Sequence, residues 1–385
     1  MRVKVVVIGM FDSIHFARWL EQFSDEEIDV YLFPSSPHRR IRPELLSLLK
    51  TPSVASFYLF RWHRLSLFVW LFDLVLSGAL RGYILSLFLR SKSPDIAHAI
   101  EIQGAGYALL TALRLPRTPK SRVVVTNYGS DLFWFGRFPK HRRRISELLS
   151  LTDLYAAECN RDLELARDFG YAGSFHTVHP NAGGFQKDAL NSPLIGRSER
   201  NLIAVKGYHG WAGKAVLGLR AIAKDKELYQ GHKIVVFSAN ARTVLSAIRL
   251  RIFSKMDISF HRKGSLSHKE MLELFSSAII YVGISETDGI STSMLEAMSQ
   301  GAIPVQSGTS CCDEWFVDSG AIIARNDLES IRSAMRLGMR LAEDDRNREI
   351  NKKTIIDRAS YDSVRAENIK MYRLPETARH RNGEK

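Results

Sequence analysis

The stretch AIIYVGISETDGISTSMLEAMSQG, from Ala278 to Gly301, contains a complete strand–loop–helix unit. Its first part, Ala278–Ser285, is an apolar run typical of a buried strand, and a helix is expected from about Ser293. Two carboxylates, Asp288 in the loop and Glu296 in the helix, stand eight positions apart. The residues alone leave two interpretations open. In the first, both carboxylates are structural, because Asp-Gly is a common turn pair and Ser-x-x-Glu is a capping box. In the second, the carboxylates bind hydroxyl groups of a ligand and the helix start binds its phosphate groups.

Similar apolar runs recur along the chain and alternate with helical patterns. The expected strands are 4–9, 29–34, 95–100, 122–129 and 154–160 in the first half, and 202–207, 233–239, 258–260, 278–285 and 302–307 in the second. This alternation favours parallel sheets covered by helices on both faces. A segment rich in Gly, Pro, Asn and Ser, 179–199, suits a linker between the two halves.

We therefore predict an α/β protein with two Rossmann-like domains whose parallel sheets face a central cleft. The N-terminal domain is expected over residues 1–185 and the C-terminal domain over 200–360, followed by a helix or tail over 361–385. Ligands of open parallel sheets bind beyond the carboxyl ends of the strands, so the loops at those ends are the first candidates for a site.

Composition narrows the classes of partner. The chain has 385 residues, too many for one ordinary core, and a net charge of +13, which implies an anionic partner such as a phosphorylated ligand, an acidic membrane or nucleic acid. The basic clusters 38–42 and 141–144 are short and accompany no nucleic-acid-binding module, so no nucleic acid is expected. Three cysteines give no disulfide framework and fit a reducing compartment, and we predict a cytoplasmic protein.

One apolar segment, 57–90, interrupts the alternation and is expected to be helical. It is buried in the N-terminal domain or in a dimer interface, or it forms a surface that dips into an anionic membrane. In the second case Arg61, Arg64, Arg81 and Arg90 would contact the lipid headgroups. Its aromatic content favours the membrane alternative.

The segment ETDGISTSMLEAMSQGAIPV, 286–305, is similar to the diagnostic segment of family 4 retaining glycosyltransferases of the GT-B fold. That segment typically reads E-G-x-x-x-x-x-L-E-A-M-A-x-G-x-P-V. Asp288 and Glu296 hold its two acidic positions, with Asp in place of the first Glu. The resemblance implies that Asp288 contacts donor-sugar hydroxyls and Glu296 the nucleotide ribose. The loop and helix start between them would line the donor site with Gly289, Ile290 and Ser291.

Looser matches to the same family lie in the first half and at the linker. They are DSIHFARWL (12–20), SPDIAHA (93–99), TNYGSDL (126–132) and HPNAGG (179–184). By this resemblance His15, His98, Tyr128 and Asp131 are candidate residues of the acceptor-binding side. Tyr128 stands where the family usually has His. Structural roles stay open for the two histidines, and a helix-capping role for Asp131. Gly9 would let the loop after the first strand approach the leaving phosphate or the acceptor.

Two lysines in VKGYHGWAGKA, 205–215, stand near the positions of the family's phosphate-binding Arg and Lys. The resemblance implies that Lys206 and Lys214 offset the diphosphate charge and stabilise its departure. The sequence has no D-x-D motif in a suitable loop, no H-E-x-x-H and no Walker A motif, so no metal and no cofactor are expected.

The resemblance thus implies a retaining, metal-independent hexosyltransferase with Asp288, Lys206 and Lys214 as catalytic residues. It would transfer a sugar from a nucleotide-diphosphate sugar, its co-substrate, to a glycan or lipid-linked acceptor in envelope polysaccharide biosynthesis. The enzyme would be peripheral on the inner face of the cell membrane. Two alternatives remain: a nucleotide-sugar epimerase on the same fold, and a basic membrane- or nucleic-acid-binding protein without catalysis.

Overall fold

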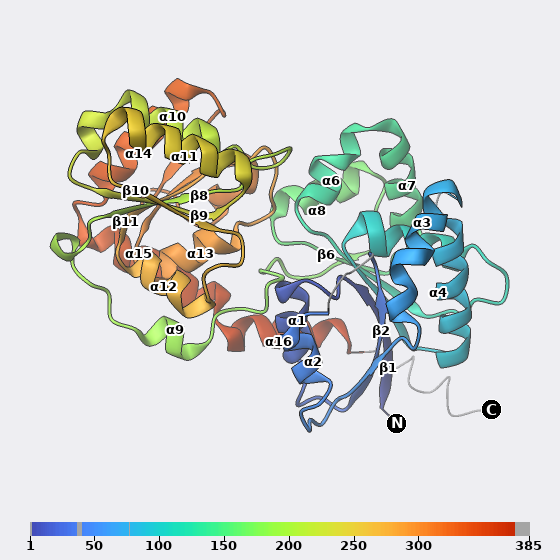
Figure 1. Ribbon diagram of the computed structural model, residues 1–385. Coiled ribbons are helices and arrows are strands. Elements are labelled where there is room, and N and C mark those ends of the chain that lie inside the picture. Colours follow the sequence, from blue (N-terminus) through green and yellow to red (C-terminus); the bar gives the residue numbers. More distant parts are fainter. Residues whose placement is uncertain (1, 37–40, 77, 374–385) are drawn as a thin grey trace. The chain divides into compact units, whose positions relative to one another are not determined.

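The computed structural model describes residues 2–36, 41–76 and 78–373 (Figure 1). The chain divides into two compact units, each of which is described by itself. The first unit contains residues 1–184 and the chain from Asp362 onward, and the second runs from Phe185 to Tyr361. Most of the basic cluster 38–42 and the last part of the predicted tail, 374–385, lie outside the described residues.

The first unit is built on a seven-stranded sheet in the order β3-β2-β1-β4-β5-β6-β7, and its strand pairs are parallel. The strands are β1 (Val3–Gly9), β2 (Ile28–Pro34), β3 (Ser56–Leu59), β4 (Ile96–Ile100), β5 (Arg122–Thr126), β6 (Leu154–Ala156) and β7 (Ser174–Phe175). The helices are α1 (Ile14–Glu21), α2 (Pro43–Leu48), α3 (Ser66–Leu76), α4 (Ala79–Lys92), α5 (Tyr107–Leu113), α6 (Ser130–Phe133), α7 (Pro139–Leu149), α8 (Asn160–Asp168) and α16 (Tyr361–Met371). The central strands are apolar and largely buried, because helices cover both faces of the sheet.

The second unit repeats this plan with a parallel six-stranded sheet in the order β10-β9-β8-β11-β12-β13. The strands are β8 (Leu202–Lys206), β9 (Lys233–Ala239), β10 (Ile258–Arg262), β11 (Ala278–Gly283), β12 (Ile303–Ser307) and β13 (Ala321–Ile323). The helices are α9 (Lys187–Asn191), α10 (Ala215–Lys224), α11 (Ala241–Ser254), α12 (His268–Ser276), α13 (Thr292–Ser299), α14 (Leu328–Leu341) and α15 (Asp345–Ala359). The cores of both units lie between sheet and helices.

The predicted α/β architecture with two parallel sheets is confirmed, and a strand is present in every expected range. Three short strands at or near the sheet edges, β3, β7 and β13, were not predicted. The expectation of a helical segment over 57–90 is wrong at its start, because Ser56–Leu59 pairs with β2. The rings of Tyr31 and Tyr58 stack across this pair with their centroids 5.0 Å apart, so aromatic contacts between strands prevail here over the helical pattern.

The C-terminal helix α16 belongs to the first unit, although it follows the whole second unit in sequence. Asn368 is fully buried and fixes the helix by its side chain. Its Oδ1 accepts hydrogen bonds from Trp19 Nε1 (3.1 Å) and His179 Nε2 (2.8 Å), and its Nδ2 donates to Gln22 Oε1. The helix therefore closes the first unit through a buried polar network.

We predict that Asn368→Ala destabilises the first unit by about 2 kcal/mol or more, because it leaves several buried polar groups without partners. Urea unfolding followed by tryptophan fluorescence measures the change. Lys370→Ala on the same helix is the control, since its ion pair with Glu367 lies at the surface and should contribute well under 1 kcal/mol. Equal stabilities of the two variants would show that the network does not hold the helix.

Candidate functional site

The candidate site lies at the point where the strand order of the second sheet reverses. The chain runs from β8 outward through β9 to β10 and then returns to place β11 on the other side of β8. Val205 pairs with Val282, so β8 and β11 end side by side. In open parallel sheets the loops diverge at such a switch point and leave room for a ligand.

The loop after β8 is fastened to the loop after β11 by backbone hydrogen bonds. Lys214 N donates to Ile284 O (2.8 Å), and Glu286 N donates to Ala212 O (2.6 Å). A Cβ atom on Gly213 would lie 2.4 Å from the carbonyl oxygen of Tyr208, so only glycine fits this tight hairpin. The hairpin sets Lys214 Nζ 3.9 Å from Glu286 Oε1.

Lys206 ends β8 and points to the start of α13. Its Nζ donates a hydrogen bond to Ser291 Oγ (3.0 Å) and lies 3.7 Å from Asp288 Oδ2. Ser291 is the N-cap residue of α13, and its hydroxyl turns to Lys206 and to the hydroxyl of Tyr281, 3.1 Å away. The Tyr281 hydroxyl is also 3.1 Å from Ser293 Oγ. A cation, three hydroxyls and a helix N-terminus thus converge at one place.

The electrostatics of Lys206 favour a full positive charge. Burial disfavours the charged ammonium, but the oxygens of Tyr281, Asp288 and Glu296 favour it and prevail, so the pKa of Lys206 lies above its ordinary value. Its side chain remains about 30% exposed. The first N–H groups of α13 add positive potential, since a helix start leaves such groups without partners inside the helix. This place is suited to anions.

The structure corrects the capping-box interpretation of Glu296. Helix α13 begins one residue earlier than expected, at Thr292, with Ser291 as its N-cap. The Ser293-x-x-Glu296 pattern therefore lies inside the helix. Glu296 is largely buried, and its Oε1 lies 3.1 Å from Nε2 of His268, the first residue of α12. The carboxylate is positioned between helices rather than at a helix end.

Asp288 and Gly289 lie in the loop before α13, where the sequence analysis predicted a loop, and Ile290 of the same loop is buried. The structure therefore brings together the donor-side candidates of the second unit: Lys206, Lys214, Asp288, Gly289, Ile290, Ser291 and Glu296. The acceptor-side candidates and Gly9 lie in the first unit.

Gly9 ends β1 at the corresponding switch point of the first sheet, between β1 and β4. A Cβ atom there would lie 2.4 Å from the ring of Phe16, so close packing of α1 against the strand requires glycine. His15 lies half-buried in the first turn of α1. His98 is fully buried in β4, with Thr126 Oγ1 at 2.7 Å from Nε2 and Tyr372 OH at 2.9 Å from Nδ1. Burial lowers the pKa of His98 to about 3, which favours its structural alternative.

Asp131 and a second carboxylate, Glu101, are buried beyond the carboxyl ends of β5 and β4. Asp131 Oδ2 accepts hydrogen bonds from the backbone N–H groups of Tyr128 (3.0 Å) and Ile102 (2.9 Å). Burial and the charge of Glu101 raise the pKa of Asp131 well above its usual range. Burial and nearby carboxylates likewise raise the pKa of the Tyr128 hydroxyl. Asp131 thus organises two loops at this edge.

Sequence reasoning missed Glu101, although the structure gives it an unusual conformation. Its φ is +75°, and its carboxylate accepts hydrogen bonds from the N–H groups of Gly104 (2.7 Å) and Ala105 (2.6 Å). Burial raises its pKa against the effect of these bonds. Such backbone strain concentrates at functional sites. Sequence reasoning also missed His268, Tyr281 and Glu286. Of these, His268 could have been placed at a helix start, because it follows Ser267, the N-cap residue of a capping box.

Comparison with solved structures identifies the fold. A glycosyltransferase from Rickettsia africae superposes with a TM-score of 0.67 at 12% identity, covering 96% of this chain and 98% of its own. The HepE protein of Anabaena in complex with UDP superposes with a TM-score of 0.64 at 12% identity, covering 96% of this chain and 99% of its own. Trehalose 6-phosphate synthase from Burkholderia multivorans superposes with a TM-score of 0.68 at 12% identity, covering 100% of this chain and 99% of its own. No protein-family model matches the sequence, and no curated protein shows significant similarity to it.

These neighbours and the two parallel sheets define the class: the chain has the GT-B fold of glycosyltransferases. Among the residues that the structure describes, no helix combines the length and the hydrophobicity needed to span a membrane.

We predict that Asp288→Asn lowers the pKa of Lys206. The substitution removes a negative neighbour, so the charged ammonium is less favoured. A ¹³C NMR pH titration of the reductively methylated protein measures this pKa, with Lys206→Arg to assign the signal. Glu286→Gln is the matched control, because Glu286 contacts Lys214 and should leave the Lys206 titration unchanged. The same pKa in both variants would contradict the pairing of Lys206 with Asp288.

Proposed function

We propose that the protein is a retaining, metal-independent glycosyltransferase that takes its sugar from a nucleotide-diphosphate sugar. The observation that carries the proposal is the cluster at the β8–β11 switch point. There Lys206, Ser291 and the start of α13 converge, with Asp288 3.7 Å from the ammonium group. The GT-B fold supports the proposal, as do the neighbours whose structures contain UDP or UDP and glucose.

In this proposal the diphosphate of the donor binds at the first turn of α13. The helix N–H groups and Lys206 contact its oxygens, and Lys214 approaches from the hairpin after β8. Glu296 binds the ribose hydroxyls through a carboxylate that His268 holds in place at 3.1 Å. Asp288 accepts hydrogen bonds from the sugar hydroxyls. Aspartate is one methylene shorter than the Glu typical of the family, so the sugar would sit closer to the loop backbone.

The reaction breaks the bond between the anomeric carbon of the sugar and the phosphate oxygen. The acceptor hydroxyl forms the new bond to the same carbon from the same face, and its proton passes to the departing phosphate. Negative charge grows on the diphosphate as the bond breaks. Lys206 and Lys214 stabilise this charge more strongly in the transition state than in the bound donor, and this difference accelerates transfer. They supply the charge that a metal ion supplies in other transferases.

We predict that Lys206→Ala weakens binding of UDP or another nucleoside diphosphate about tenfold or more, since charge-assisted hydrogen bonds contribute about 1.5–3 kcal/mol. Isothermal titration calorimetry with UDP, GDP, ADP and dTDP identifies the base and measures the loss. Lys269→Ala is the matched control, because Lys269 is 87% exposed and its ammonium group pairs with Glu273 of the same helix, α12.

Unchanged affinity in Lys206→Ala, or an equal loss in Lys269→Ala, would contradict the proposed donor site. Incubation of the protein with a nucleotide sugar alone, followed by NMR, separates transfer from its alternative. Conversion of the donor to its epimer without any acceptor would favour an epimerase on this fold.

We further propose that the enzyme acts at the cytoplasmic face of a membrane, on a glycan or lipid-linked acceptor of envelope polysaccharide synthesis. Helix α3 supports this part of the proposal. Its apolar side chains point largely to solvent, with Phe72 at 63% and Val75 at 84% exposure. The exposed Arg61 and Arg64 lie just before the helix. An exposed apolar patch beside cations suits the interface of an anionic bilayer.

We predict that the double variant Phe72→Ser/Val75→Ser loses binding to vesicles that contain phosphatidylglycerol, because burial of these side chains in lipid drives association. Cosedimentation with vesicles, with and without the anionic lipid, measures binding. Phe253→Ser in α11 is the matched control, since Phe253 is equally exposed (85%) but lies in the second unit. If the wild type is instead a dimer that the double variant converts to a monomer, α3 is a dimer interface and the membrane proposal fails.

A further inference from the structure

A recess of about 180 Å³ in the first unit combines basic and apolar walls. Trp70 and Leu74 of α3 form one wall, and Arg81 of α4 and Arg144 of α7 contribute two guanidinium groups. Gln103 lies in the turn that directly follows β4, so the recess opens at the carboxyl edge of the first sheet. It lies in a different unit from the proposed donor site.

Two guanidinium groups and one carboxylate line the recess, and the charges of Glu101 and Glu147 act on Arg81 and Arg144 from outside the lining. Asp73 is the carboxylate on its wall; it lies 3.6 Å from Arg81 Nε, and its oxygens also accept the N–H groups of Leu80 and Arg81 at the start of α4. Burial lowers the pKa of Arg81. Burial also lowers the pKa of Arg144, and the charge of Arg81 lowers it further. Two guanidinium groups that repel each other around one recess would be stabilised by an anion between them.

Helix α7 contributes further positive charge. The consecutive residues 140–144 of its first turns are Lys, His and three Arg, although cations oppose the dipole at a helix start. Arg144 is held against the ring of Tyr107, with its guanidinium carbon 3.9 Å from the ring centroid. Arg143, in contrast, points to solvent and pairs with Glu147. Residues that break a local stability rule are expected at functional sites.

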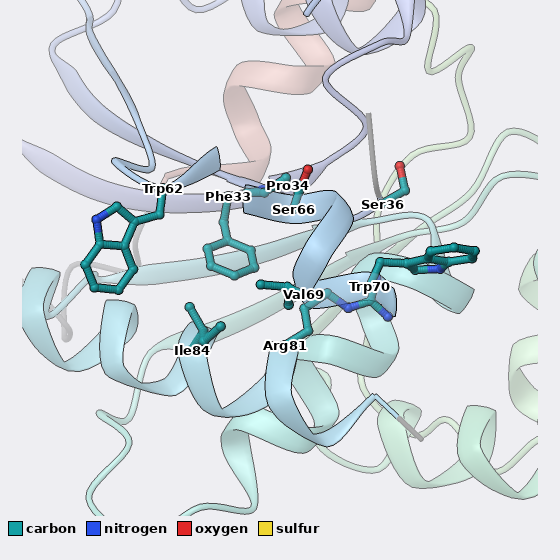
Figure 2. Close-up of a pocket in the computed structure, with 9 residues that line it drawn as sticks. All are labelled: Phe33, Pro34, Ser36, Trp62, Ser66, Val69, Trp70, Arg81 and Ile84. Atoms are coloured by element: carbon teal, nitrogen blue, oxygen red, sulfur yellow. The ribbon is translucent and has the colours of Figure 1, made fainter. Parts of the chain in front are cut away.

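An apolar slot adjoins the recess and shares Trp70 and Arg81 with it. Figure 2 shows the Arg81 side chain beside Val69 and Trp70, with Phe33 and Ile84 farther along the slot and Trp62 at its other end. Helix α3, which lines the slot through Val69 and Trp70, also exposes Leu71, Phe72, Leu74 and Val75 to solvent. Basic groups therefore lie beside apolar side chains of α3, a combination that fits a molecule with an anionic head and an alkyl chain.

We propose that this recess binds the phosphate head of an amphiphilic acceptor, whose alkyl chain runs along the exposed apolar face of α3. The guanidinium groups of Arg81 and Arg144 contact the phosphate oxygens, for which their planar N–H geometry is suited. Trp70 and Leu74 contact the first methylenes of the chain. The identification of this ligand as the acceptor rests on the proposed transferase function, whereas its binding does not.

The surrounding side chains favour an amphiphile over nucleic acid. The recess places two guanidinium groups at one point beside the aliphatic Leu71, Leu74 and Val75, whereas single-stranded nucleic acid is bound by a basic groove that follows its backbone over several nucleotides. An alkyl chain gains from aliphatic surface directly, because each methylene removed from water adds to binding. In this proposal Arg81 and Arg144 bind the phosphate group, and α3 binds the alkyl chain.

The experiment is calorimetry on the full-length protein with three probes below their micelle concentrations: octyl phosphate, octyl glucoside and inorganic phosphate. We expect octyl phosphate to bind to one site, and both other probes to bind at least tenfold more weakly. Arg144→Gln should weaken octyl phosphate about tenfold or more, and Arg144→Lys should weaken it less. Leu74→Ser should weaken octyl phosphate and leave inorganic phosphate unchanged.

Arg143→Gln is the matched control, since it removes the neighbouring cation outside the recess and should leave all three affinities unchanged. Equal affinity for inorganic phosphate and octyl phosphate, or tight binding of octyl glucoside, would overturn the proposal. So would an Arg144→Gln variant that is folded by circular dichroism and binds octyl phosphate like the wild type. No probe is a nucleotide sugar, so failure here leaves the donor site untouched, and failure of UDP binding leaves this recess untouched.

Discussion

The parallel pairing of β8 with β11 is the constraint on which the candidate donor site depends. Lys206 and Asp288 are far apart in sequence, and neither loop alone forms a site. The register of this pair, Val205 beside Val282, ends both strands at one level and brings Lys206 Nζ to within 3.0 Å of Ser291 Oγ. A slip of one residue would turn Lys206 to the other face of the sheet.

The elements that the sequence predicted correctly are those with a local signal. Strands β1, β8 and β11 are apolar runs buried on both faces, so their sequences alone predict buried strands. Edge strand β3 is half-exposed and lies next to helical patterns, so its four residues gave no distinct signal. The capping-box interpretation failed for a similar reason. Ser291 and Ser293 are both plausible N-cap residues, and the choice of Ser291 depends on Lys206 and Tyr281, which come from other strands.

The residues that sequence reasoning missed act through contacts between distant elements. His268 meets Glu296 because α12 and α13 pack together, and Glu101 meets Asp131 because β4 and β5 are neighbours. The C-terminal helix α16 is the extreme case, since Asn368 contacts Trp19 and Gln22 at the other end of the chain. A motif spanning a few residues carries no information on such pairs. Conversely, the acidic positions of the diagnostic segment were predictable, because one loop and one helix contain both.

The two units use the same topology with opposite electrostatics at the carboxyl edges of their sheets. The first sheet buries two carboxyl groups, Glu101 and Asp131, in backbone hydrogen bonds. The second leaves two ammonium groups partly exposed and only loosely paired, at 3.7 Å for Lys206–Asp288 and 3.9 Å for Lys214–Glu286. These distances exceed those of charge-assisted hydrogen bonds, so the pairs orient the lysines and yield little energy that a ligand must replace. In the proposed function, a diphosphate takes over both cations and releases the carboxylates, which frees Asp288 to bind the sugar.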